Sequence, residues 1–269
     1  MRILIVNDDG IHAPGLAVAE EIARDYAGPE GEIWVVAPES ERSGASHAIT
    51  YTQPLRYTEL GPRRFAVDGF PADCAMLGLR RLLRETPPDL VLSGVNRGHN
   101  LAEDVFYSGT VGAAMDATLN GVRAVAMSQT YSRAADAPAD MWESARAHGA
   151  AALKAVLAME APAGVFHNVN FPARHPDAVE GMTVCPHGTR AAATFEIETL
   201  TAPNGRDYQF LRHTTANRSA ASGTDAALCA AGWITITPLR TDLSAHDLIE
   251  AGQASLDATR AADSRAQTG

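Results

Sequence analysis

Short apolar runs recur through the first half of the chain, separated by polar or small residues. Four of them are rich in Val, Ile and Leu with little alternation, as is typical of strands buried on both faces of a parallel sheet. These runs are Ile3–Val6, Ile33–Ala37, Leu90–Leu92 and Val122–Met127.

Segments with helical signals lie between these runs. Pro14–Tyr26 has proline in its first turn and Gly28 just beyond its end, which are start and stop signals. Ala72–Leu83 carries apolar residues at a helical spacing, and Gly112–Leu119 is followed by an Asn-Gly stop signal. The alternation predicts an α/β fold with a doubly wound, mostly parallel, Rossmann-like sheet.

The last third of the chain has a different pattern. Phe195–Leu200 and Tyr208–Leu211 flank a Pro-Asn-Gly turn, which predicts a β-hairpin arm at about residues 192–214 and favours oligomerisation through that arm. A further strand is expected at Trp233–Pro238. Asp257–Gly269 is polar and alanine-rich without an apolar pattern, so we expect one domain over residues 1–256 and a disordered tail over 257–269.

Composition and charge narrow the classes of function. The chain has 269 residues, of which 46% are hydrophobic and 20% charged, enough for a large core. Its formal net charge of −10 gives no general attraction to a nucleic-acid polymer or to an anionic membrane. The uncharged stretch Ala226–Leu239 is shorter than the roughly 20 residues of a membrane helix. Three scattered cysteines without CxxC spacing indicate a reducing compartment, so we expect a cytoplasmic protein.

An acidic pair, Asp8 and Asp9, directly follows the first predicted strand. In an open parallel sheet, ligands bind outside the carboxyl ends of the strands. Adjacent carboxylates repel each other, so a hard cation such as Mg²⁺ or Mn²⁺ would account for the pair. A turn with a helix-capping aspartate would account for it as well.

Three more polar segments follow predicted strands or lead into a helix. Ser43 in one loop and Asn96 in another offer neutral oxygen ligands, although connecting loops often have the same composition. Ser108 and Thr110 precede a helix whose N-terminal N–H groups suit a phosphate, with an ordinary N-cap as the alternative. Together these groups suit metal-assisted phosphoryl transfer.

Other classes of α/β protein lack support in the sequence. A dinucleotide-dependent oxidoreductase needs a G-x-G-x-x-G fingerprint, and a P-loop enzyme needs its lysine motif; neither pattern is present. A phosphorylated receiver domain also has an acid pair after its first strand. It would need an aspartate after a middle strand, where this chain has Ser93-Gly94.

Several long motifs occur in order along the chain: NDDGIHAPG at Asn7–Gly15, RSGAS at Arg42–Ser46, GFPADC at Gly69–Cys74, SGVNRGHN at Ser93–Asn100, YSGTVGAA at Tyr107–Ala114 and ITPLRTDLSAHD at Ile236–Asp247. These motifs and their order resemble the survival protein SurE family of 5′-nucleotidases. The resemblance runs from Met1 to about residue 250. The chain departs from the family pattern at His99, where proline or alanine is commoner, and at Phe70, where threonine is usual.

The resemblance implies hydrolysis of nucleoside 5′-monophosphates, and in some members of 3′-nucleotides and short polyphosphate. It implies one Mg²⁺ or Mn²⁺ per subunit and a homodimer or homotetramer built through the C-terminal arm. Whether Asp8 attacks phosphorus or orients a water is left open, and His12 and His99 remain candidates for a general acid or phosphate donor. The implied site residues are Asp8 and Asp9 as catalytic groups, Asp8, Asp9, Ser43 and Asn96 as metal ligands, and Ser108, Gly109 and Thr110 as phosphate-binding residues.

Overall fold

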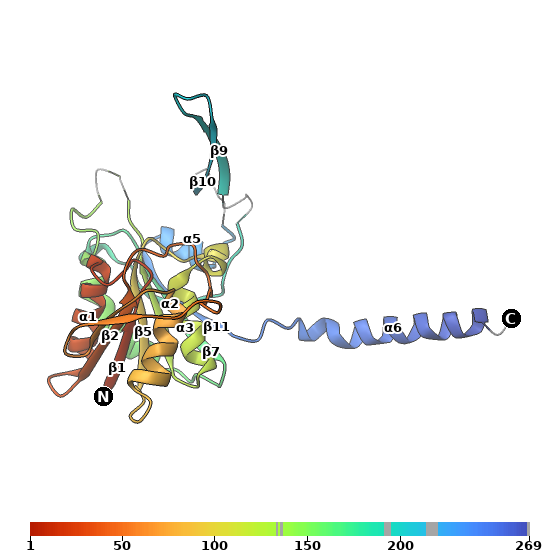
Figure 1. Cartoon of the computed structure of the whole chain (residues 1–269), viewed down its shortest axis with the longest axis horizontal. Helices are drawn as coiled ribbons and strands as arrows, with labels where there is room; N and C mark the ends of the chain where they lie inside the picture. The colour runs from red at the N-terminus through yellow and green to blue at the C-terminus, as the bar shows by residue number, and fades with distance from the viewer. Residues whose placement is uncertain (133, 135–136, 191–194, 214–219, 268–269) are drawn as a thin grey trace. The chain divides into compact units, whose positions relative to one another are not determined.

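The computed structural model describes residues 1–132, 134, 137–190, 195–213 and 220–267 (Figure 1). It divides into two units, Met1–Leu239 and Arg240–Gly269. The first unit contains a nine-stranded sheet with the strand order β3-β4-β2-β1-β5-β6-β7-β11-β8. The strands of this sheet are β1 (Arg2–Val6), β2 (Glu32–Pro38), β3 (Tyr57–Gly61), β4 (Arg64–Val67), β5 (Leu90–Arg97), β6 (Ala124–Gln129), β7 (Val165–Phe171), β8 (Gly181–Val184) and β11 (Trp233–Arg240).

The central strands of the sheet are paired in parallel. β1 lies between β2 and β5, and the parallel pairing continues from β5 to β6 and from β6 to β7. At one edge of the sheet, β3 pairs with β4 in antiparallel orientation. The doubly wound, mostly parallel fold expected from the sequence is therefore confirmed. The helical segments are α1 (Pro14–Ala27), α2 (Pro71–Leu77), the π-helical η1 (Gly78–Leu82), the 3-10 segments η2 (Ala102–Phe106) and η3 (Pro176–Ala178), α3 (Gly109–Leu119), α4 (Glu143–Ala158), α5 (Asp225–Ala230) and α6 (His246–Gln267).

Each face of the sheet carries its own apolar core. Successive side chains of a strand point to opposite faces, so Ile3 and Ile5 of β1 pack with residues of α1 and α4, such as Ile22 and Leu153. Leu4 and Val6 belong to the other cluster, with residues of α2 and α3. Full burial of each such side chain contributes about 1.5–3 kcal/mol relative to exposure, which explains why β1 reads as an unbroken apolar run.

Several elements differ in extent from the sequence-based expectation. β5 continues to Arg97, so Ser93–Asn96 form the end of a strand rather than a loop after it. Helix α3 begins at Gly109, one turn earlier than expected. The expected helix Ala72–Leu83 is split into α2 and the π-helical η1.

The arm is a separate two-stranded antiparallel sheet made of β9 (Phe195–Thr201) and β10 (Asp207–His213). The hairpin expected at about residues 192–214 is confirmed for residues 195–213; residues 192–194 and 214 lie outside the described residues. An isolated bridge between Arg190 and Ala220 joins the chain on either side of the arm.

The C-terminal unit differs from the expected disordered tail. Helix α6 spans His246–Gln267 and so continues through the polar segment that begins at Asp257. Alanine is the best helix former, so an apolar pattern is not needed for helix formation here. Asp257 accepts a hydrogen bond from Gln253 one turn earlier, at 2.9 Å. The boundary near residue 240 also places the start of this helix outside the unit that holds the large sheet.

Candidate active site

The carboxyl ends of β1, β2 and β5 bring polar residues from distant parts of the chain to one place. Asp8 follows β1, Ser43 lies in the loop after β2, and Asn96 ends β5. Together with Ser108 they line a cavity of about 340 Å³. Because these three strands are neighbours in parallel register, the sheet itself creates this convergence.

Asp8 is the most deeply placed carboxylate of this cavity and is only 3% exposed. The Thr110 hydroxyl donates a hydrogen bond to its Oδ1 at 2.7 Å. Burial raises the pKa of Asp8 to about 6, the charge of Asp9 adds to the rise, and the Thr110 hydrogen bond opposes it. A buried carboxylate beside a second carboxylate is a place where a bound cation lowers the electrostatic free energy.

The N-terminus of α3 lies directly against Asp8. Ser108 is the N-cap of this helix, and its Oγ accepts from the Val111 N–H at 3.1 Å. A Cβ added at Gly109 would stand 2.9 Å from Asp8 Cβ and 3.0 Å from Pro71 Cγ, so only glycine allows this approach. The positive end of the helix dipole and its first-turn N–H groups therefore lie beside the carboxylate, where an anionic phosphate is favoured.

Thr110 has a position that the sequence did not reveal. It is fully buried, and its hydroxyl is committed to Asp8. Its side chain thus fixes the Asp8 carboxylate instead of lining the cavity, whereas Ser108 does line it.

Asp9 lies next to this cavity and lines a neighbouring one of about 260 Å³, together with Glu41 and Trp142. Its Oδ2 accepts the Arg97 N–H at 2.9 Å. Burial and the nearby Glu41 raise the pKa of Asp9, against the lowering effect of the Arg97 hydrogen bond. Three of the four expected metal ligands therefore share one cavity, and the fourth is tied to the backbone at the end of β5.

The two neutral candidate ligands are held in defined orientations. The Asn96 side-chain Nδ2 donates to the Gly98 carbonyl at 2.9 Å, which leaves its Oδ1 as the atom suited to a cation. Ser43 Oγ donates to Glu41 at 2.8 Å. Upstream, Gly94 has a φ of +132°, and an added Cβ would lie 2.3 Å from the Met127 carbonyl. Glycine there lets β5 approach β6 closely before Asn96.

The donor set fits a hard divalent cation. Carboxylate, hydroxyl and amide oxygens are the ligands that Mg²⁺ and Mn²⁺ prefer. Among the described residues, no group of three or more His, Cys, Asp or Glu side chains is arranged to hold a metal. A site of the expected kind has only two such residues, with serine and asparagine as the remaining ligands.

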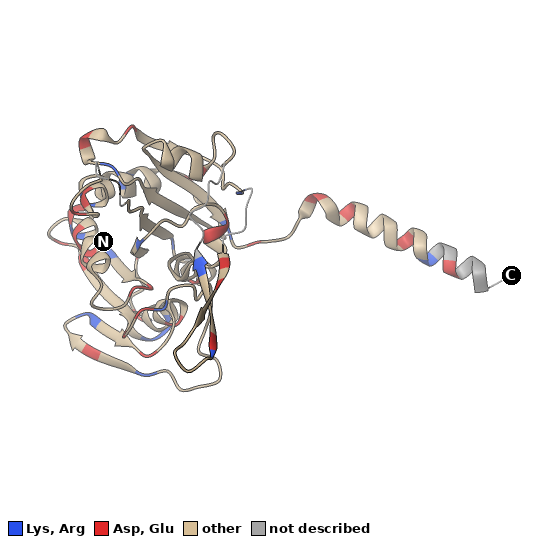
Figure 2. Cartoon of the chain, turned by 90° about the horizontal axis from the view of Figure 1, so that it is seen from above, with Lys and Arg blue, Asp and Glu red and all other residues tan. Residues whose placement is uncertain are grey.

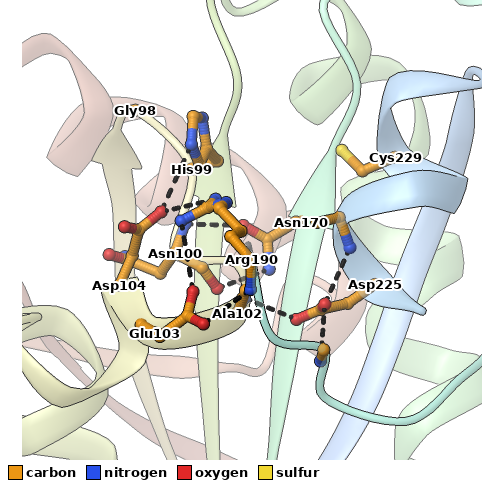
Figure 3. Close-up of polar contacts among 12 residues, drawn as sticks. Gly98, His99, Asn100, Ala102, Glu103, Asp104, Asn170, Arg190, Asp225 and Cys229 are labelled. Carbon is orange, nitrogen blue, oxygen red and sulfur yellow. Dashed lines mark hydrogen bonds and ion pairs between the residues drawn. The ribbon is translucent and has the colours of Figure 1, made fainter. Parts of the chain in front are cut away.

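A cluster of ionic contacts borders the cavity and was not recognised from the sequence (Figure 3). Asp104 binds both Arg190, at 2.8 Å, and His99, at 3.3 Å. Burial alone would raise the pKa of Asp104, but the hydrogen bonds from His99 and Arg190 lower it well below its usual range. His99 lines the cavity, whereas His12 is exposed.

A network of asparagine side chains fixes the loop that follows His99. The Asn100 N–H donates to Asn170 Oδ1 at 2.8 Å, its Nδ2 donates to Ser128 Oγ at 2.7 Å, and its carbonyl accepts from Asn168 at 2.7 Å. The signal for this network in the sequence was the presence of two asparagines in β7, between its apolar residues.

The fold and site define a doubly wound α/β protein with an oxygen-rich cavity at the carboxyl edge of its sheet. Comparison with known proteins agrees with that class. The family described as Survival protein SurE matches residues 3–194, and the chain belongs to this family.

Individual relatives extend the similarity over nearly the whole chain. A protein of Cereibacter sphaeroides named 5′-nucleotidase SurE is 49% identical over 251 residues, which is 92% of this chain and 96% of the relative. A protein of the same name from Ruegeria pomeroyi is 45% identical over 260 residues, covering 95% of this chain and 100% of the relative. The crystal structure of SurE protein from Aquifex aeolicus superposes with a TM-score of 0.79 at 33% identity, covering 93% of this chain and 98% of that one.

Proposed function

We propose that this protein is a divalent-metal-dependent 5′-nucleotidase that hydrolyses nucleoside 5′-monophosphates to nucleoside and phosphate. The observation that carries the proposal is the single cavity that joins Asp8, Ser43, Asn96 and Ser108 at the N-terminus of α3. Membership of the SurE family, a family of metal-dependent phosphatases, supports it, as do the names of the relatives.

We assign one Mg²⁺ or Mn²⁺ per subunit to Asp8, Asp9, Ser43 and Asn96. When bound, such a cation neutralises phosphoryl oxygens and lowers the pKa of a bound water. The chain's own residues do the remaining work. Thr110 holds the Asp8 carboxylate in place, and Ser108 with the N–H groups of Gly109 and Thr110 faces the phosphate. Asp8 and Asp9 are the catalytic carboxylates in this assignment.

The same assignment accommodates 3′-nucleotides and short polyphosphates as secondary substrates. They share with 5′-nucleotides the terminal phosphate that the cation and the helix N-terminus would bind. Long nucleic-acid chains are not expected as partners. In Figure 2 the Lys and Arg positions are spread singly or in pairs over the ribbon, and the net charge is −10.

The hairpin arm is proposed to join subunits into a homodimer or homotetramer. Its apolar side chains are uncovered within the single chain: Leu211 is 74% exposed, Ile197 70% and Leu200 44%. Apolar side chains on a two-stranded sheet with open edges favour pairing with a second copy.

We also propose a cytoplasmic location. Cys74, Cys185 and Cys229 are buried free thiols, an arrangement that suits a reducing compartment. No helix in the described residues is long and apolar enough to cross a membrane.

The direct test is release of inorganic phosphate from adenosine 5′-monophosphate by the purified full chain. Activity is expected with added Mg²⁺ or Mn²⁺, to be lost on addition of excess EDTA and to return when either metal is resupplied, because oxygen ligands favour these cations over Zn²⁺. Full turnover in excess EDTA, with no metal found by elemental analysis, would overturn the metal assignment. Absence of nucleotide hydrolysis with every metal supplied would overturn the activity.

A further inference from the structure

His99 is shared by the linings of two neighbouring cavities. The smaller one, of about 340 Å³, contains Asp8 and Ser108. The larger one, of about 570 Å³, is bordered by Leu101, Tyr131 and other residues that are largely apolar. The His99 side chain is 31% exposed, so the ring faces accessible space and is in a position to meet a bound molecule.

The ring of His99 contacts Asp104, which is itself paired with the buried Arg190. The ring Nε2 lies 3.3 Å from Asp104 Oδ2. The same oxygen lies 2.8 Å from Arg190 Nη2, and the side chains of Asp104 and Arg190 are only 9% and 6% exposed. Figure 3 shows the ring and the guanidinium converging on Asp104. A ring fixed in this way loses little conformational entropy when it binds a ligand.

The backbone that follows His99 is fixed as well. The Ala102 N–H donates to Asp225 Oδ2 at 3.0 Å, and the Asn100 N–H donates to Asn170 Oδ1 at 2.8 Å. Glu103 accepts the Arg190 N–H at 2.6 Å, which ties the loop to the chain that leads into the arm. His99 therefore has a set position between the two cavities.

The phosphate, sugar and base of a nucleotide match the two cavities and the residue that they share. Its phosphate suits the cavity at Asp8 and the α3 N-terminus, and its flat base suits the larger, mostly apolar cavity. The sugar then falls between them, beside His99. Resting on the proposed nucleotidase function, we propose that His99 is a specificity-determining residue that hydrogen-bonds the sugar of the substrate. Asp104 and Arg190 are positioning residues that hold its ring.

The test compares three phosphate esters on the full chain: adenosine 5′-monophosphate, ribose 5-phosphate and p-nitrophenyl phosphate. His99→Ala is expected to lower kcat/KM for the two sugar phosphates by about tenfold, as expected for one lost hydrogen bond. The loss should be carried by KM and should exceed the loss for p-nitrophenyl phosphate several-fold. His175→Ala is the matched control, because its ring also pairs with a carboxylate, Glu143, at 3.1 Å, but lines neither cavity.

Asp104→Asn tests the positioning role. It should shift the same substrate ratio in the same direction by a smaller factor, again through KM, while a thermal melt confirms that the variant is folded. Equal losses on all three esters, or no loss in His99→Ala, would overturn the inference. A loss for adenosine 5′-monophosphate that spares ribose 5-phosphate would also overturn it, since His99 would then contact the base. Failure of the parent protein to hydrolyse either sugar phosphate, with p-nitrophenyl phosphate still cleaved, identifies failure of the proposed function instead.

Discussion

Gly109→Ala places one methyl group where the N-terminus of α3 meets Asp8. The added Cβ would lie 2.9 Å from Asp8 Cβ and 3.0 Å from Pro71 Cγ. Carbon atoms in contact normally stand about 3.5–4.0 Å apart, so the Asp8 carboxylate or the helix has to move by roughly 0.5–1 Å. A displacement of about 1 Å in a catalytic group costs on the order of 100-fold in rate.

The effect of the same substitution on stability should be small, because two contributions oppose each other. Overpacking costs about 1–3 kcal/mol, whereas alanine in place of glycine within a helix gains about 0.5–1 kcal/mol. The net loss of about 0–2.5 kcal/mol lowers Tm by about 2–4 °C per kcal/mol in a chain of this size. We therefore expect Gly109→Ala to be a folded protein with about 1% of the parental kcat/KM for adenosine 5′-monophosphate.

The assay pairs steady-state phosphate release with a thermal melt. Gly252→Ala is the matched control, since a Cβ added at Gly252 in α6 has no atom within 4 Å, and it should keep parental activity. A Gly109→Ala variant that retains more than about a third of the activity would contradict the geometric argument, because the required displacement is of the size that costs about 100-fold.

Three further predictions concern the ligands, the arm and the ionic cluster. Asp8→Asn and Asp9→Asn should each remove most turnover, because each deletes a charge that the cation needs. Ser43→Ala should lower turnover by about 10- to 100-fold, because water can replace a neutral ligand. Steady-state kinetics at saturating Mn²⁺ measures the loss in each variant. Deleting Glu196–Phe210 and closing the gap with a short glycine-containing turn should weaken assembly but not cation binding, as followed by light scattering during size-exclusion chromatography. Asp104→Asn should reduce the free energy of unfolding at neutral pH, with the difference from the parent fading as the pH falls below about 4.

The sign of the pH effect follows from the direction of the shift. The pKa of Asp104 is lowered in the folded state from its usual 3.8, so its stabilisation is present above that value and is lost as acid protonates it. A difference that grows on acidification would contradict this assignment. For the ligands, the contradicting result is a larger loss in Ser43→Ala than in Asp8→Asn. For the arm, it is a monomeric parent at micromolar concentration or a deletion variant that assembles as tightly as the parent.

Strands buried on both faces were predictable because their burial leaves an unbroken apolar run, as in β1. The prediction ended β5 at Leu92 because the residues that follow are polar or small. Pairing with β6, where Asn96 lies opposite Ser128, carries the strand further, and no local signal reports that pairing. β7 was missed for a related reason: the side-chain amides of its two asparagines donate to the carbonyl of the distant residue Asn100.

Part of the candidate site could likewise be predicted from the sequence. Parallel neighbours end at one edge, so the meeting of Asp8, Ser43 and Asn96 could be inferred without coordinates. The direction of each side chain could not. Asp9 faces a different cavity, and the Thr110 hydroxyl serves Asp8, because these orientations depend on contacts made across the fold.

The bridge between Arg190 and Ala220 makes the arm an insertion with adjoining ends. Changes in the arm beyond this bridge do not alter the spacing of the two chain segments that connect the arm to the rest of the first unit. Lengthening a flexible insert costs little, about 0.6 kcal/mol for each doubling. The arm can therefore vary in length through evolution or design, while the edge of the sheet that carries Asp8 keeps its geometry.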